Sequence, residues 1–159
     1  MIIKSPAKIN LFLNIVNKRN DGYHDIETYF QLINLYDEIT LDVIPGSKIN
    51  FSSNNDLLCN HNNLCVKAAE ILKNHALVGH DHNVSIKLLK NIPIGGGLGG
   101  GSSNAASVLL GLNDLWKCNL KKEELLSLGE KLGSDVPVFI NGFSAYGKNT
   151  GNHLTDLCR

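Results

Sequence analysis

The sequence Pro93-Ile94-Gly95-Gly96-Gly97-Leu98-Gly99-Gly100-Gly101-Ser102-Ser103-Asn104 contains six of the chain's 15 glycines and separates two periodic segments. Alternating apolar residues from 84 to 88 predict a strand before it. Apolar residues at helical spacing from 105 to 116 predict a helix after it, capped by Ser102. Glycines let the backbone adopt positive φ and approach an anion closely, and a helix that begins here adds unpaired N–H groups and the positive end of its dipole. This stretch therefore predicts a phosphate-binding loop.

Other interpretations of the glycine loop fit less well. It is not a Walker A loop, because no lysine precedes the serines. Gly95, Gly97 and Gly100 match the G-x-G-x-x-G pattern, but a dinucleotide site also needs an acidic residue at the end of a second parallel strand. Glu123 and Glu124 lie instead in a charged helical segment. A flexible surface loop is the remaining alternative, and the periodic segments on both sides disfavour it.

The rest of the chain predicts strands and helices around this loop. Residues 6–16 alternate and predict a half-buried strand, with Lys8 and Asn10 on the face opposite the inward-facing Ala7, Ile9, Leu11, Leu13 and Ile15. Further strands are predicted at 26–34, 38–44, 48–52, 84–89 and, as the last apolar part, 136–140 with 143–146. Helices are predicted at 64–72, with Asn62 or Asn63 as the cap, and at 121–132, ending at Gly133. The order of these elements predicts an α+β fold with a sheet covered by helices on one face.

Composition excludes several classes of protein. Fifteen basic and 15 acidic residues give a formal net charge of zero, so a nucleic-acid partner is not expected. No apolar run approaches the ~20 residues that span a bilayer, and the N-terminal residues do not resemble a secretion signal. We therefore expect a cytoplasmic chain without a membrane partner. Cys59, His61 and Cys65 could be imagined as zinc ligands, but no second cluster matches them, and we expect no metal site in the protein.

Two charged residues are candidates for catalysis, although each has a structural alternative. Lys8 shares a strand face with Asn10, and such a face is usually a solvated sheet surface. Asp135 follows Gly133-Ser134, where an acid can simply cap the next turn. Taken alone, each is better explained as structural.

Four segments taken together change this interpretation. The sequences Pro6-Ala7-Lys8-Ile9-Asn10-Leu11, Asp21-Gly22-Tyr23-His24, the glycine loop and Gly133-Ser134-Asp135-Val136-Pro137 occur in that order. In this the chain resembles the small-molecule kinase family that includes galactokinase, homoserine kinase and mevalonate kinase, called GHMP kinases. The long glycine motif and Asp-Gly-Tyr-His are typical of the branch that acts on 4-diphosphocytidyl-2-C-methyl-D-erythritol.

The resemblance implies a fold, an activity and a set of site residues. The fold would be the N-terminal domain of the GHMP kinases, related to domain 2 of ribosomal protein S5. The activity would be ATP-dependent phosphorylation of a hydroxyl of that cytidine substrate, in the non-mevalonate route to isoprenoid precursors, with Mg²⁺ delivered on the nucleotide. Asp135 and Lys8 would be the catalytic pair, Asn10 would lie near the acceptor sugar, and Tyr23 and His24 would meet the cytosine. The ATP phosphates would lie against Pro93, Ile94, Gly95, Gly96, Gly97, Leu98, Gly99, Gly100, Gly101, Ser102 and Ser103, with Asn63, Leu64 and Lys90 near the adenosine.

One departure from the family concerns domain organisation. Family members usually continue into a second domain that completes the substrate cleft, and nothing in this sequence corresponds to it. We expect residues 1–146 to form the ATP-binding domain and residues 147–159 to begin a connection to an absent C-terminal domain. The chain would then be an active kinase, a nucleotide-binding half with little or no activity, or a non-enzymatic interaction module on the same fold. Apolar surface left uncovered would also promote homodimers or aggregates.

Overall fold

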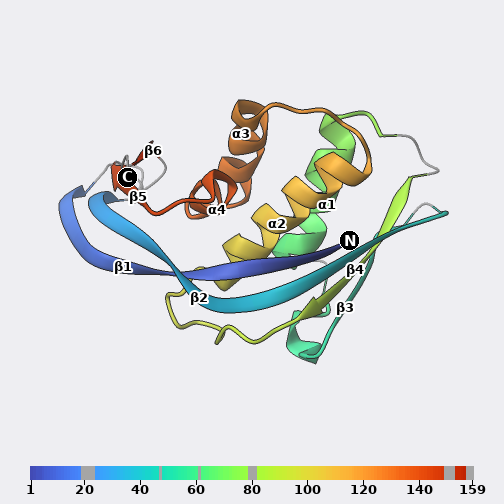
Figure 1. The fold of residues 1–159 in the computed structure, drawn as a ribbon, viewed down its shortest axis with the longest axis horizontal. Helices are drawn as coiled ribbons and strands as arrows, with labels where there is room; N and C mark the ends of the chain where they lie inside the picture. Colours follow the sequence, from blue (N-terminus) through green and yellow to red (C-terminus); the bar gives the residue numbers. More distant parts are fainter. Residues whose placement is uncertain (19–23, 47, 61, 79–81, 149–152, 157–159) are drawn as a thin grey trace.

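The computed structural model describes residues 1–18, 24–46, 48–60, 62–78, 82–148 and 153–156. Within these residues, four α-helices lie on one face of a six-stranded sheet (Figure 1). The predicted α+β architecture, with a sheet covered by helices, is confirmed. In chain order the elements are β1 (Ile2–Lys18), β2 (His24–Ile44), β3 (Asn50–Ser53), the 3-10 helix η1 (Asp56–Leu58), α1 (Leu64–His75), β4 (Asn83–Leu89), α2 (Gly100–Leu115), α3 (Lys122–Leu132), α4 (Val136–Asn141), β5 (Ala145–Lys148) and β6 (His153–Asp156).

The long strand β2 organises the sheet. β1 pairs with it antiparallel along most of its length, while β5 pairs with residues 28–30 and β4 with residues 38–44. Because β1 occupies one edge at both places, β4 and β5 must share the opposite edge of β2. Residues 31–37 of β2 have neither β4 nor β5 beside them. The sheet therefore has an opening on that edge, at the point where β4 ends and the glycine loop begins.

The core lies between α1, α2 and the helix-facing side of the sheet. Apolar residues of α1 and α2 repeat at helical spacing and are buried against β2 and β4. At Gly111 of α2, an added Cβ would lie 2.5 Å from Ile3 Cδ1 and 2.6 Å from Leu41 Cδ1. The glycine lets α2 pack closely against the side chains of β1 and β2, so the helix that follows the glycine loop lies directly on the sheet.

Several predicted elements match the structure, with changes at their ends. Asn63 caps α1 as expected, because its Oδ1 accepts a hydrogen bond of 2.8 Å from Cys65 N. The strands predicted at 26–34 and 38–44 are one continuous strand, β2. The helix after the loop begins at Gly100 and not at Ser102. Its N-cap is Gly99, whose left-handed backbone ends the loop.

The prediction for β1 was only partly right. Lys8 is 6% exposed instead of solvated, whereas Leu11, Leu13 and Ile15 are 59%, 57% and 61% exposed instead of inward. The β1–β2 register is irregular at three places, between residues 6 and 7, 10 and 12, and 15 and 17. Residues 11–18 of β1 are exposed on both faces of the strand, and this end of β1 extends past the helical layer (Figure 1).

The prediction of a strand at 136–140 was wrong, because Val136–Asn141 forms α4. Pro137 lies in its first turn, where a missing N–H costs no hydrogen bond, and Gly142 ends it with φ of 79°. The predicted strand 143–146 is replaced by β5. Among the described residues, none of the helices combines the length and the apolar character needed to cross a lipid bilayer.

Candidate active site

The glycine loop follows β4 and reaches the N-terminus of α2. Gly95, Gly97 and Gly99 have φ of 77°, 70° and 68°, so every second residue is in a conformation that side chains disfavour. The carbonyl of Leu98 accepts a hydrogen bond of 2.9 Å from the backbone N–H of Lys8. A Cβ on Gly99 would lie 2.8 Å from Phe139 Cζ and 3.1 Å from Lys8 Cγ. The loop is therefore held against β1 and α4 at its far end, while the positions of Gly95 and Gly97 are open.

Two adjoining cavities lie along this loop. One, of about 300 Å³, is lined by residues 93–102 together with Leu58, Leu64 and Lys90. The other, of about 250 Å³, is lined by Asn63, Leu64 and Lys90, among others. The residues predicted for the phosphates and for the adenosine thus line neighbouring spaces. Ser103 differs from the rest of the set, since it is fully buried and lines neither cavity.

The predicted catalytic residues meet at the end of the loop. Lys8 Nζ lies 3.3 Å from Asp135 Oδ2 and donates a hydrogen bond of 2.8 Å to Asn10 Oδ1. Asn10 Nδ2 in turn donates to Thr28 Oγ1 at 2.7 Å, and that hydroxyl donates to the Phe12 carbonyl at 2.7 Å. The side chain of Lys8 is 8% exposed and that of Asp135 is 32% exposed. A buried ammonium therefore faces a carboxylate that solvent, or a substrate, can reach.

The alternative role of Asp135 as a helix cap is not what the structure shows. Asp135 is the N-cap residue of α4, but its side chain makes no capping hydrogen bond. Its backbone φ of −85° and ψ of −14° are helical, whereas a capping residue usually has extended backbone angles. The carboxylate is turned toward Lys8 instead.

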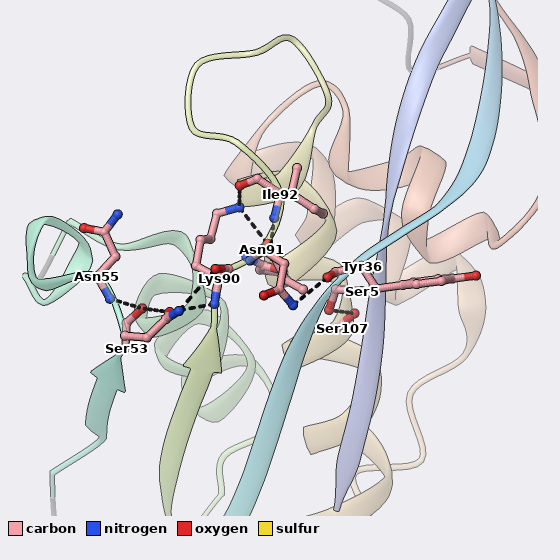
Figure 2. Close-up of polar contacts among 11 residues, drawn as sticks. Ser5, Tyr36, Ser53, Asn55, Lys90, Asn91, Ile92 and Ser107 are labelled. Carbon is pink, nitrogen blue, oxygen red and sulfur yellow. Dashed lines mark hydrogen bonds and ion pairs between the residues drawn. The ribbon is translucent and has the colours of Figure 1, made fainter.

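Asp37 is a residue of this region that the sequence did not reveal. It lies on β2 and is fully buried. Its Oδ1 accepts hydrogen bonds of 2.7 Å from the backbone N–H groups of Asn91 and Ile92, and its Oδ2 accepts one of 2.9 Å from Asn104 Nδ2. Lys90 Nζ lies 2.9 Å from the same Oδ2 and also donates to the Ile92 carbonyl. Figure 2 shows these contacts around Lys90, Asn91 and Ile92, below the turn of the loop.

Cys65 lines the smaller cavity and lies close to this cluster. Burial raises the pKa of its thiol to about 12, and the negative charge of Asp37 adds to the effect. The thiol is therefore protonated at neutral pH, so it contributes an uncharged, weakly polar surface to the cavity.

The residues predicted for the cytosine are not placed by the structure. Tyr23 lies outside the described residues, and His24 opens β2, with only its backbone described. Within the described part of the chain, no three His, Cys, Asp or Glu side chains come together as a metal site. Delivery of Mg²⁺ by the nucleotide stays a prediction.

Comparison with known proteins gives a consistent result. A family model described as the GHMP kinases N terminal domain matches residues 63–143. A 4-diphosphocytidyl-2-C-methyl-D-erythritol kinase of Colwellia psychrerythraea is 53% identical over 153 residues, which are 96% of this chain and 50% of that protein. A kinase of the same name from Acinetobacter baumannii is 47% identical, over 96% of this chain and 54% of its own length. The chain thus spans about half the length of these relatives.

Solved structures agree with the sequence relatives. A crystal structure of 4-(cytidine 5'-diphospho)-2C-methyl-D-erythritol kinase superposes with a TM-score of 0.85 and 36% identity, over 99% of this chain and 55% of its own. A mevalonate kinase structure superposes with a TM-score of 0.68 at 17% identity, over 99% of this chain and 56% of its own, which supports the fold alone.

Proposed function

Because this chain belongs to the GHMP kinase family, we propose that it is the ATP-binding part of a kinase that phosphorylates a hydroxyl of 4-diphosphocytidyl-2-C-methyl-D-erythritol. One observation carries the proposal: the Lys8–Asp135 pair, 3.3 Å apart, adjoins the glycine loop, and the same Lys8 donates its backbone N–H to that loop. A small-molecule kinase needs a phosphate-binding loop and a base for the acceptor hydroxyl. Here Lys8 contacts both the loop and the proposed base, Asp135.

The triphosphate of ATP would lie in the cavity along residues 93–102. Backbone N–H groups of the open glycines and the N-terminus of α2 would bind its oxygens. Lys90 has three N–H donors, of which two are used by Asp37 and the Ile92 carbonyl, so one is left for the nucleotide. The adenosine would occupy the neighbouring space beside Asn63 and Leu64, which is lined partly by apolar groups that suit a base.

Asp135 would hold the acceptor hydroxyl in line with the γ-phosphorus. In a loose phosphoryl-transfer transition state, a carboxylate mainly orients the nucleophile and accepts its proton late. Lys8 pairs with Asp135 and would stabilise negative charge on the transferring group. The hydrogen bond from Lys8 to Asn10 helps to fix the ammonium in this position, because it uses a second donor of the same nitrogen.

Recognition of the substrate and the domain organisation extend the proposal. Asn10 would lie near the acceptor sugar, and Tyr23 and His24 would stack on and bind the edge of the cytosine. Residues 1–146 would form the ATP-binding domain, and residues 147–159, which include the end of β5 and all of β6, would lead toward a second domain. Partners would then be the small molecules ATP and the cytidine substrate, and exposed apolar surface would also allow a homodimer.

A second candidate is a nucleotide-binding domain that has little kinase activity by itself. The matched kinases are about twice as long as the aligned region. Closure of a substrate cleft excludes water and holds the acceptor in line, and positioning of this kind can supply about 7 to 11 kcal/mol. On this proposal residues 1–159 by themselves would bind ATP but transfer phosphate slowly.

The two candidates differ in one assay. The purified chain is titrated with ATP by calorimetry and then incubated with ATP and the cytidine substrate, with ADP measured. A full-length relative serves as the reference. ATP binding with ADP formation near the reference rate supports the complete kinase, and ATP binding with a rate lower by powers of ten supports the nucleotide-binding domain with little activity. Absence of ATP binding contradicts both.

A further inference from the structure

Resting on the proposed function of the glycine loop, we propose that Asp37 is a positioning residue that fixes both ends of the loop and so sets its affinity for the triphosphate. Nothing in the catalytic arrangement requires this carboxylate to touch a substrate. Its contacts instead connect the segment just before the loop to the helix just after it.

The first step is the position of Asp37 in the sheet. The last pair between β2 and β4 is Glu38 with Leu89, so Asp37 is the first residue of β2 beyond the ladder. At that point the chain leaves the sheet, and the N–H groups of Asn91 and Ile92 lose strand partners. The Asp37 carboxylate accepts both of them at 2.7 Å. A side chain thus continues the hydrogen bonding that the strand has stopped providing.

The second step is the link to α2. Asn104, near the start of that helix, donates its Nδ2 to the other oxygen of Asp37 at 2.9 Å. Ile92 and Asn104 flank the loop on its two sides, so one carboxylate holds them at a fixed separation. Because Asp37 is fully buried, direct contacts with its carboxylate set this separation.

The third step concerns charge. A fully buried carboxylate is costly unless several donors compensate its lost hydration. Lys90 Nζ lies 2.9 Å from Asp37, and the position of a Cβ on Gly100 would be only 3.1 Å from the same nitrogen. Lys90 lines both cavities, so Asp37 also holds the lysine ammonium where the nucleotide would lie, beside the helix end of the loop.

Together these contacts make the loop ready for a ligand before the ligand arrives. The segments on its two sides are tied to Asp37, and Leu98 within the loop is tied to Lys8 through its carbonyl. A loop that is already ordered loses less conformational entropy on binding, which raises affinity. The inference predicts that loss of Asp37 weakens binding of the triphosphate much more than binding of the nucleoside.

The experiment compares Asp37→Asn with Ser107→Ala in the same chain. Ser107 is also buried on α2 and accepts a hydrogen bond of 2.7 Å from Ser5 Oγ, but it does not contact the loop. Ser107→Ala therefore removes a buried hydrogen bond, as Asp37→Asn does, but should leave the order of the loop unchanged. Hydrogen exchange of residues 94–103 and the dissociation constants of ATP and adenosine are measured for each variant, below the onset of unfolding.

For Asp37→Asn we expect exchange in the loop to be about tenfold faster or more, the dissociation constant of ATP to rise about tenfold or more, and that of adenosine to change less than about twofold. Ser107→Ala should leave all three within about twofold of the unaltered chain. If Asp37→Asn does not fold, Asn104→Ala provides the test without unpairing Lys90. Because Asn104 also lines the cavity proposed for the adenosine, the readout is then hydrogen exchange in the loop, which should be about threefold faster or more.

Unchanged ATP affinity in the folded variant overturns the inference, and so does an equal loss for ATP and adenosine. Failure of the proposed function is a separate result: the unaltered chain would then bind no ATP at all. The exchange measurement needs no nucleotide, so it would still show whether Asp37 orders the loop.

Discussion

Gly97 and Gly99 offer a matched pair of substitutions that separates the shape of the glycine loop from its proposed ligand. Both have a left-handed backbone, with φ of 70° and 68°. A Cβ on Gly97 would have no neighbour within 4 Å, whereas one on Gly99 would meet Phe139 at 2.8 Å and Lys8 at 3.1 Å. The two alanine variants therefore carry the same backbone strain and differ in steric overlap.

The expected magnitudes follow from this difference. An L-residue in the left-handed region costs about 1 to 2 kcal/mol, so the free energy of unfolding of both variants should fall by that amount. Gly99→Ala loses about 1 to 3 kcal/mol more, because the Phe139 ring is buried and overpacking in a filled site costs that amount. For a chain of this size the extra loss lowers Tm by roughly 2 to 4 °C per kcal/mol. The added methyl group of Gly99→Ala should also push the Lys8 side chain away from Asp135.

Gly97→Ala should give the opposite result. Its added methyl group enters the open space along the loop, where the proposed phosphate would approach, so the affinity for ATP should fall while the fold stays near normal. Thermal unfolding and ATP titration of both variants and of the unaltered chain provide the test. Equal stability of the two variants would refute the argument from Phe139 and Lys8. Unchanged ATP affinity of Gly97→Ala would show that phosphates do not bind at this loop.

The other predictions concern single side chains. In a complete kinase that contains this domain, Asp135→Asn should lower kcat by about 10² to 10⁴ with ATP affinity retained, while the exposed Asp114→Asn should not; a variant that keeps most of its kcat removes Asp135 from the role. Tyr23→Ala should weaken binding of the cytidine substrate by about 1 to 3 kcal/mol without affecting binding of ATP. Equal affinity of this variant and the unaltered protein for the cytidine substrate would argue against stacking. Because the Cys65 pKa is raised from 9.0 to about 12, the unfolded thiol ionises first, so Cys65 should make stability fall between pH 9 and 12. The test measures the free energy of unfolding of the unaltered chain and of Cys65→Ser as a function of pH. The same pH dependence in both proteins would contradict the prediction.

The sequence predicted the glycine loop well because its signals are local. A strand pattern before it, a helical pattern after it and the glycines themselves all lie within about 30 residues, and each depends only on its own neighbours. The cap at Asn63 was predictable for the same reason, since an asparagine side chain bonds the backbone two residues on. Where a signal is complete within one turn or one strand, the printed sequence was enough.

Val136–Asn141 shows a case in which local preference was misleading. β-branched and aromatic residues favour strands, and the segment contains Val136, Val138, Phe139 and Ile140. All four are buried, and α4 packs against α2 and α3. Tertiary packing on two helices outweighs a strand preference that spans about 1 kcal/mol, and no signal within the segment reveals those neighbours.

Lys8 and Asp37 share one cause, which the sequence conceals. In the β1–β2 register Pro6 pairs with Tyr36 but Ala7 pairs with Ile33, so β2 contains two extra residues at this point. Lys8 lies just on one side of this irregularity, and Asp37, paired with Ser5, lies just on the other. Irregularities of this kind redirect side chains, and here the alternation that predicted a solvated Lys8 is broken directly before it.

The same irregularity adjoins the opening in the sheet, where residues 31–37 of β2 lack β4 and β5. At this place the backbone of the loop needs hydrogen-bond partners that strands do not provide. The buried carboxylate of Asp37 supplies them for Asn91 and Ile92 just before the loop, and the backbone N–H of Lys8 supplies one for the carbonyl of Leu98. Both buried charges are therefore consequences of how two strands pair and where a third one stops. Lys8 is recognisable because its neighbours in sequence match a pattern, whereas Asp37, one of several acidic residues of β2, becomes visible only when the register is known.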